Sequence, residues 1–267
     1  MSEALETKVR AVFLDAGQTL LDADPPVRQV YGDAFARYGV AATEEALRQA
    51  LVETWAVVSA LDQEGKERWA GREGERGFWR FFVQHVYARV GGGELPDELF
   101  TDLIAHFADV KSWRVYDDAW EVLAALRAMG LKLVVVSNWD STLPRLLDAL
   151  ELTPHFDAVV VSAIVGAAKP SARIFEAALE LAGVAPGEAL HVGDSPGDDY
   201  HGARAAGLRS LLLDRRGCAG GECEAIRSLA ELPARLRSQD RVLDPVGEVE
   251  RAAQHHPHPE ADPGGGG

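Results

Sequence analysis

The chain has 267 residues, of which 47% are hydrophobic, and a formal net charge of -15. This length fits one large domain or a core with a smaller inserted domain. Because nucleic-acid phosphates and acidic membranes repel such an acidic surface, the charge argues against both as partners, while small anionic substrates stay open.

The N-terminal residues 1–6 lack the basic start and apolar stretch of a signal peptide, and no apolar segment is long enough to span a bilayer. The two cysteines, Cys218 and Cys223, are too few for a disulfide framework and have no second ligand pair for structural zinc. We therefore expect a cytoplasmic protein with two free thiols in a surface loop. The oligomeric state stays open.

Short apolar segments rich in β-branched residues predict five strands, over residues 9–14, 131–136, 158–161, 189–192 and 210–213. Segments with helical periodicity separate the later strands and end before Gly130 and Gly183. This alternation predicts an α/β fold with a parallel sheet and right-handed crossovers. In such sheets, ligands bind at the carboxyl ends of the strands.

Residues from about 25 to 110 break the alternation and predict a helical insert between the first two strands. Its first helix is expected to end at Gly39, Thr43 to cap the second, and residues 78–90 and 96–107 to form two more. The insert occupies the place of a lid over the site. We interpret most of its aromatic residues as helix core and those that face the site as selecting substrate, among Trp55, Trp69, Phe78, Trp79 and Phe82.

Polar residues follow the predicted strands and indicate a site for an anion. The Asp15 carboxylate can attack phosphorus and form an acyl phosphate, and the Ser137 hydroxyl with the amides around Asn138 can hold a phosphoryl oxygen. The Lys169 ammonium can neutralise Asp15 and the transferred group. Each residue also has an ordinary alternative: Asp15 as a turn cap, Ser137 as a helix cap and Lys169 as a solvated surface residue.

Three acidic residues, Asp194, Asp198 and Asp199, crowd the end of the fourth predicted strand. Such crowding is costly without a cation, and Mg²⁺ needs only one or two protein carboxylates besides water and substrate. Asp15 and Asp194, from neighbouring strands, are therefore expected to hold Mg²⁺. A solvated helix cap is the alternative interpretation of the acidic cluster.

Four motifs in this order resemble the haloacid dehalogenase-like hydrolase superfamily, in the subfamily with a helical cap inserted after the first motif. The resemblance covers residues 9–232 approximately and rests on Asp15-Ala-Gly-Gln-Thr-Leu, Ser137-Asn-Trp-Asp, Lys169-Pro and His191-Val-Gly-Asp-Ser-Pro-Gly-Asp-Asp. It implies a Rossmann-like catalytic core over residues 1–21 and 111–243 and a helical cap over residues 22–110. Residues 244–267 lack apolar periodicity and are expected to form a disordered tail.

The resemblance also implies roles for single residues. Asp15, the Gly17 carbonyl and Asp194 would bind the metal, and Asp199 would support the metal shell. Asp15 would be the nucleophile, with Ser137 and Lys169 as the other catalytic residues. The residues that bind the substrate would be Ser137, Asn138 and Lys169.

The chain departs from the family at Gly17, where phosphatases of this family carry a second Asp that protonates the leaving group and later activates water. Gln18 also replaces the usual Gly. Dehalogenases lack that Asp too and work without metal, but they do not usually carry a pair like Gly193-Asp194. We therefore favour a magnesium-dependent hydrolase of a small phosphorylated compound that acts through an aspartyl-phosphate.

Two alternatives remain: a 2-haloacid dehalogenase-type carbon–halogen hydrolase, and a phosphate- and metal-binding protein with weak turnover. The first suits Gly17, because breaking a carbon–halogen bond requires no proton for the leaving group. A residue of the cap or Asp22 would replace the missing acid in a phosphatase.

Overall fold

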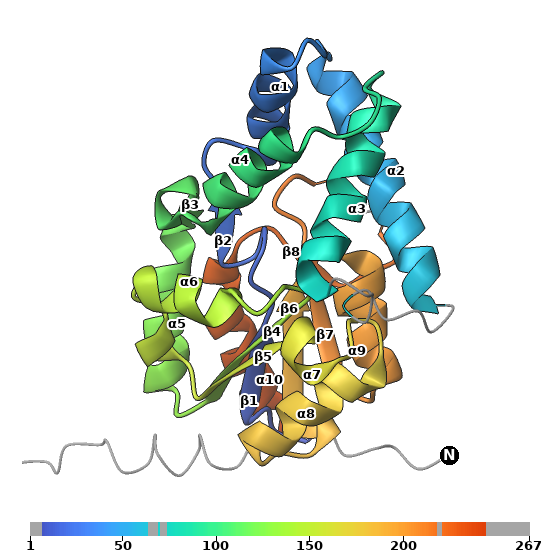
Figure 1. The fold of residues 1–267 in the computed structure, drawn as a ribbon. Coiled ribbons are helices and arrows are strands. Elements are labelled where there is room, and N and C mark those ends of the chain that lie inside the picture. The colour runs from blue at the N-terminus through green and yellow to red at the C-terminus, as the bar shows by residue number, and fades with distance from the viewer. Residues whose placement is uncertain (1–6, 64–68, 70–73, 218–220, 244–267) are drawn as a thin grey trace, which may run out of the picture.

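The computed structural model describes residues 7–63, 69, 74–217 and 221–243, so the expected tail and Cys218 lie outside the described residues. Within them, a six-stranded sheet with all neighbouring strands parallel forms the centre of the fold (Figure 1). In sheet order, its strands are β5 (Ala158–Val161), β4 (Lys132–Ser137), β1 (Ala11–Leu14), β6 (Ala189–Gly193), β7 (Arg209–Leu213) and β8 (Ala225–Ile226).

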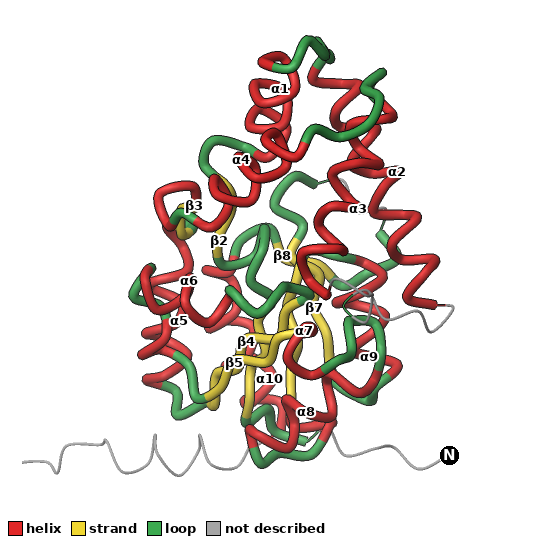
Figure 2. The backbone as a smooth tube through the Cα atoms, viewed as in Figure 1, coloured by secondary structure: helices red, strands yellow, loops and turns green. Residues whose placement is uncertain are grey.

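The order of the strands places a topological switch point beside β1. The chain runs outward from β1 through β4 to β5, and then returns to the other side of β1 with β6. β1 thus pairs with β4 on one side and with β6 on the other. Figure 2 shows the strands of the sheet in yellow, below the helices of the segment between β1 and β4. This is the strand order of Rossmann-like sheets, in which ligands bind where the direction reverses.

Both faces of the sheet are buried, as alternation of the β1 side chains shows. Val12 and Leu14 pack on one face, and Ala11 and Phe13 on the other. The first face carries helices α5 (Asp117–Ala128), α6 (Leu143–Ala149) and α10 (Leu232–Leu243), and the second carries α8 (Ala172–Ala182) and α9 (Gly202–Ala205). The predicted α/β fold with a Rossmann-like core is confirmed.

The segment between β1 and β4 adds helices that pack around a hydrophobic cluster of their own. They lie as a separate group above the sheet in Figure 1. Thr43 caps the second helix as predicted, because its Oγ1 accepts a hydrogen bond from the Ala46 N–H at 3.2 Å. The helices of this segment are α1 (Val27–Arg37), α2 (Glu44–Gln63), α3 (Gly74–Arg89) and α4 (Asp97–Ala108).

A short antiparallel ribbon joins the two ends of this helical insert, and the sequence did not indicate it. β2 (Leu21–Ala23) pairs with β3 (Trp113–Val115), and the Asp24 N–H donates to the Ser112 carbonyl at 2.8 Å. The two connections between the insert and the sheet therefore run side by side and fix where the helices stand above the strands.

Candidate active site

The buried Lys169 ammonium is the centre of a charged cluster at the carboxyl ends of the strands. Its Nζ donates to Asp15 Oδ1 at 2.7 Å and to Asp199 Oδ1 at 2.5 Å. Asp15 directly follows β1, and Asp199 lies in a π-helical turn (Pro196–His201) that follows β6. All three side chains are almost fully buried, so these contacts are strong and poorly screened.

Asp199 is fixed by further donors. His191, fully buried on β6, contacts Asp199 Oδ1 through its Nε2 at 2.8 Å, and the Ser195 N–H donates to Oδ2 at 2.9 Å. Burial lowers the pKa of His191, so the neutral ring donates from Nε2. Burial opposes ionisation of Asp199, but the Lys169 ammonium and His191 hold the pKa of Asp199 below its usual range. Asp199 is therefore an anion, and each of its two oxygens already accepts a hydrogen bond.

Asn138 fixes the backbone of Lys169. Its Oδ1 accepts from the Lys169 N–H at 2.7 Å, and its Nδ2 donates to the Lys169 carbonyl at 2.9 Å and to Asp198 Oδ2 at 3.3 Å. The buried Ser137 hydroxyl lies close enough to Asp15 for a hydrogen bond from it to lower the pKa of that carboxyl. The structure thus brings the predicted residues together and gives Asn138 a positioning contact, while substrate binding by Asn138 stays a prediction.

The acidic residues fit a divalent cation. Oxygens of Asp15, Asp194 and Asp199 all lie within 4.8 Å of one another. Burial raises the pKa of Asp15 despite Lys169, and burial with the neighbouring Asp15 raises the pKa of Asp194 well above its usual range. When all three carboxylates are ionised, the single ammonium leaves two excess negative charges. Since Asp199 is occupied, Asp15 and Asp194 are the carboxylates available to a metal.

The turn that carries Gly17 is closed by the Leu20 and Leu21 N–H groups, which both donate to the Ala16 carbonyl at 2.9 and 3.0 Å. Positive φ falls on Gln18, at 55°, and not on Gly17. A Cβ at position 17 would lie 3.4 Å from Trp139 Cζ3, an ordinary contact distance. The backbone therefore accepts a side chain at Gly17.

Asp22, considered above as a replacement acid, is engaged with a tyrosine. The Tyr116 hydroxyl donates to Asp22 Oδ2 at 2.9 Å, and Asp22 Oδ1 accepts from the Ala23 N–H. Burial and this hydrogen bond raise the pKa of Tyr116 to about 12. Asp22 lines the same cavity as Asp15, so its role as the acid stays a prediction.

A cavity of about 1100 Å³ lies between the charged cluster and the helical insert. Hydrogen bonds tie the insert to the core around it: Trp79 Nε1 donates to Asp140 Oδ2 at 2.7 Å, and the Ser141 hydroxyl to Glu75 Oε2 at 2.8 Å. The cavity is lined by Asp15, Gly17, Ser137, Asn138, Lys169, Asp194 and Asp199 on the core side, and by residues of all four inserted helices on the other.

Three arginines of the insert, spaced one helical turn apart in the sequence, differ in their surroundings. Arg76 lines the cavity, with its guanidinium 4.8 Å from the centre of the Phe100 ring. Arg80 forms an ion pair with Asp97 at 2.7 Å. Arg72 lies outside the described residues.

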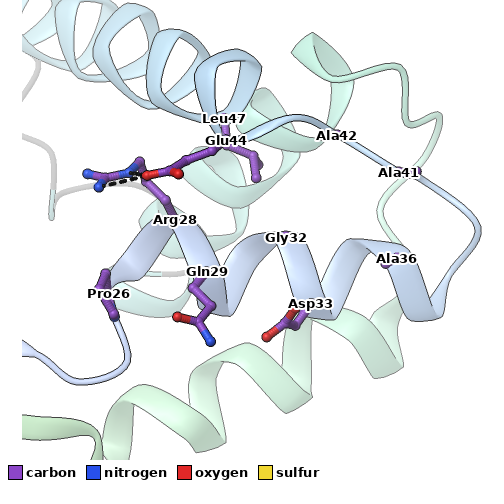
Figure 3. A pocket seen from close by; sticks show the side chains of 10 residues that line it. All are labelled: Pro26, Arg28, Gln29, Gly32, Asp33, Ala36, Ala41, Ala42, Glu44 and Leu47. Carbon is purple, nitrogen blue, oxygen red and sulfur yellow. Dashed lines mark hydrogen bonds and ion pairs between the residues drawn. The ribbon is translucent and has the colours of Figure 1, made fainter.

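A second hollow, of about 450 Å³, lies between α1 and the loop that leads into α2 (Figure 3). Its Arg28 side chain is paired with Glu44, at 3.1 Å. None of the polar residues of the sheet edge lines this hollow. The cavity at Asp15 is therefore the candidate active site.

Comparison with known sequences places this site in a class of hydrolases. The sequence pattern of the haloacid dehalogenase-like hydrolases matches residues 9–207. The chain belongs to this family, as the resemblance predicted. The mouse protein named haloacid dehalogenase-like hydrolase domain-containing protein 3 is 33% identical over 213 residues, which cover 77% of this chain and 82% of that protein. A phosphoserine phosphatase from Thermus thermophilus is 33% identical over 229 residues, 78% of this chain and 89% of the phosphatase.

Solved structures agree on the fold. A phosphatase of this family from Thermococcus onnurineus superposes with a TM-score of 0.58 at 27% identity and covers 85% of this chain and 98% of its own. The L-2-haloacid dehalogenase from Xanthobacter autotrophicus superposes with a TM-score of 0.63 at 22% identity, and the match covers 86% of this chain and 98% of the dehalogenase. The chain is a hydrolase of this family. None of the helices among the described residues is long and apolar enough to cross a bilayer.

Gly193 gives a test of how the cluster is held together. A Cβ at this position would lie 2.2 Å from Asp199 Cγ, too close for any side chain. We expect Gly193→Ala to displace Asp199 and to lower the free energy of unfolding by roughly 1–3 kcal/mol, as overpacking does. Urea unfolding measures this. Gly197→Ala is the matched control, because nothing lies within 4 Å of its Cβ position; equal stability of the two variants would contradict the packing argument.

Proposed function

We propose that the protein is a magnesium-dependent phosphatase that acts on a small phosphorylated compound through an aspartyl-phosphate on Asp15. The observation that carries this proposal is the buried contact between Lys169 and Asp15 beside Asp194. We further propose the division into a catalytic core (1–21 and 111–243) and a helical cap (22–110), and a cytoplasmic location. The names of a phosphoserine phosphatase and of a family phosphatase among its relatives support the reaction class.

In the proposed reaction, the Asp15 carboxylate attacks phosphorus while the bond between phosphorus and the ester oxygen breaks. Water then cleaves the acyl phosphate and restores the carboxylate. Lys169 and Ser137 oppose the rise in the pKa of Asp15 that burial causes, and the contact with Lys169 orients the carboxylate. Asp15, the Gly17 carbonyl and Asp194 would hold Mg²⁺, which when bound supplies positive charge to the phosphoryl oxygens.

The second candidate function is carbon–halogen hydrolysis, which the lack of a side chain at Gly17 favours. The same Asp15 carboxylate would then attack carbon, and halide would leave without a proton. The acidic cluster favours the phosphatase, because without a metal its three carboxylates, when ionised, leave two excess negative charges uncompensated. Dependence on metal therefore separates the two candidates.

Asp15→Asn should abolish hydrolysis while the protein stays folded, because the amide has nearly the same shape but is a poor nucleophile. We expect kcat to fall by more than about 10³-fold. The measurement is phosphate release by purified enzyme, with Asp148→Asn, at an exposed site of α6, as the control. An active Asp15→Asn enzyme would rule out the covalent mechanism.

Chelation should stop phosphate release, and added Mg²⁺ should restore it. Asp194→Asn should raise the Mg²⁺ concentration needed for half-maximal activity by at least about tenfold, since one of two available carboxylates is lost. Titration of activity with Mg²⁺ after chelation measures both effects. An unchanged rate in chelator would show that the metal assignment is wrong and would favour the dehalogenase.

Gly17→Asp should raise phosphatase activity on alkyl esters, because a carboxyl two residues beyond Asp15 can protonate the leaving group. We expect a gain of roughly tenfold for benzyl phosphate, a small part of the usual effect of general acids, and less for 4-nitrophenyl phosphate, whose leaving group needs little protonation. Gly17→Asn is the matched control with the same shape and no proton to give. Equal rates for the Asp and Asn variants would mean that another group supplies the proton.

A further inference from the structure

The cavity above Asp15 has a wall of aromatic rings that begins beside Gly17. Trp139 lies next to the Gly17 backbone, and its ring centre is 4.9 Å from that of Trp113. Phe107 follows at 6.0 Å from Trp113, and Tyr31 at 6.0 Å from Phe107. All four rings line the cavity, so the wall runs without a break from the reacting groups to helix α1.

A second aromatic wall stands on helices α2 and α3. The ring centres of Trp79 and Phe82 are 5.9 Å apart, and those of Phe82 and Trp55 are 4.6 Å apart. Leu51, one helical turn before Trp55, lines the same cavity. Aromatic rings attract one another best in offset or edge-to-face geometry, so these walls suit a planar aromatic guest.

Among the residues that the structure describes, polar groups are few in the part of the cavity formed by the helices. They are Tyr31, Ser59, Glu75 and Arg76, and Glu75 already accepts the hydrogen bond from Ser141. The Trp79 N–H is likewise occupied by Asp140. A sugar or polyol in this space would exchange its hydrogen bonds with water for contacts with apolar rings, which is unfavourable. The cavity therefore favours an apolar organic group on the phosphate.

The reacting end of the cavity points to the same class of compound. No side chain at Gly17 is present to protonate a leaving alkoxide. A phenol is more acidic than an aliphatic alcohol, so its oxygen leaves from phosphorus with less help from a general acid. A phosphate on an aromatic hydroxyl thus fits the aromatic walls, and its cleavage does not require the acid that is missing at Gly17.

We propose that the substrates are phosphate monoesters of phenols, with the aryl ring between the two aromatic walls; this rests on the proposed phosphatase function. Asp15 forms the new bond to phosphorus, the bond from phosphorus to the aryl oxygen breaks, and the phenolate takes a proton from water. A second water then releases inorganic phosphate and restores Asp15.

The first experiment compares esters with Mg²⁺ present. Phenyl and 2-naphthyl phosphate have similar leaving groups but differ in ring area, so we expect kcat/KM to be at least tenfold higher for the naphthyl ester, about 1.4 kcal/mol of binding. Phosphoserine and glycerol 1-phosphate should be poorer than both. If phosphoserine or glycerol phosphate is preferred, or if naphthyl and phenyl esters react equally, the aryl assignment is wrong. No release of phosphate from any of these esters, or from the acyl phosphate acetyl phosphate, would instead overturn the phosphatase function itself.

The second experiment uses neighbouring residues of α2. Leu51→Asp puts a charge into the cavity, whereas Val52→Asp puts the same charge at a residue that is 58% exposed to solvent. Leu51→Asp should lower kcat/KM for 2-naphthyl phosphate at least tenfold and leave that for acetyl phosphate, which has no aromatic ring to place against the walls, within about twofold. Val52→Asp should change neither. Full naphthyl activity in an active Leu51→Asp enzyme would contradict the proposal; if that variant does not fold, the comparison of phenyl and naphthyl esters decides.

Discussion

The buried ion pair network around Lys169 is the interaction on which the rest of the site depends. Its ammonium has left water, and the loss of hydration is offset only by Asp15 and Asp199, at 2.7 and 2.5 Å. Removing one partner of such a network costs about 3–5 kcal/mol, because a buried charge is left uncompensated. The surrounding contacts serve this geometry: Asn138 fixes the Lys169 backbone, and His191 fixes Asp199.

The same network would explain how a strongly acidic chain could bind the anionic substrate proposed above. The net charge of -15 repels anions at a distance. Close to Asp15, the local field is set by Lys169 and by any cation held at Asp15 and Asp194. Under the proposed function, a divalent metal at Asp15 and Asp194 would bring the excess negative charge of the ionised cluster to zero, so that an anionic phosphate would no longer be repelled there. Binding of the proposed substrate would therefore depend on prior binding of the metal.

The sequence predicted all strands of the sheet except β8, and the residues at its edge, because these follow from short-range patterns. Apolar runs gave the strands, and polar residues that end a buried strand must meet at the carboxyl edge, as Asp15 and Asp194 do. The role of His191 was missed, since a histidine inside an apolar strand has the pattern of a core residue. The ribbon of β2 and β3 was also missed, because its two strands are short and far apart in the chain.

Trp139 joins two features that the sequence presents separately, the missing acid and the aromatic cavity. Its ring lies beside Gly17 and is also the first ring of the aromatic wall. Ser162 fixes the backbone of Trp139, because the Ser162 hydroxyl accepts a hydrogen bond from the Trp139 N–H at 3.1 Å and donates one to the Trp139 carbonyl at 3.0 Å. The same hydroxyl accepts from Trp69 Nε1 of the insert at 3.0 Å. A shift of the insert would therefore move the wall and the surroundings of Gly17 together, and under the proposed function this would couple the choice of leaving group to the position of the helices.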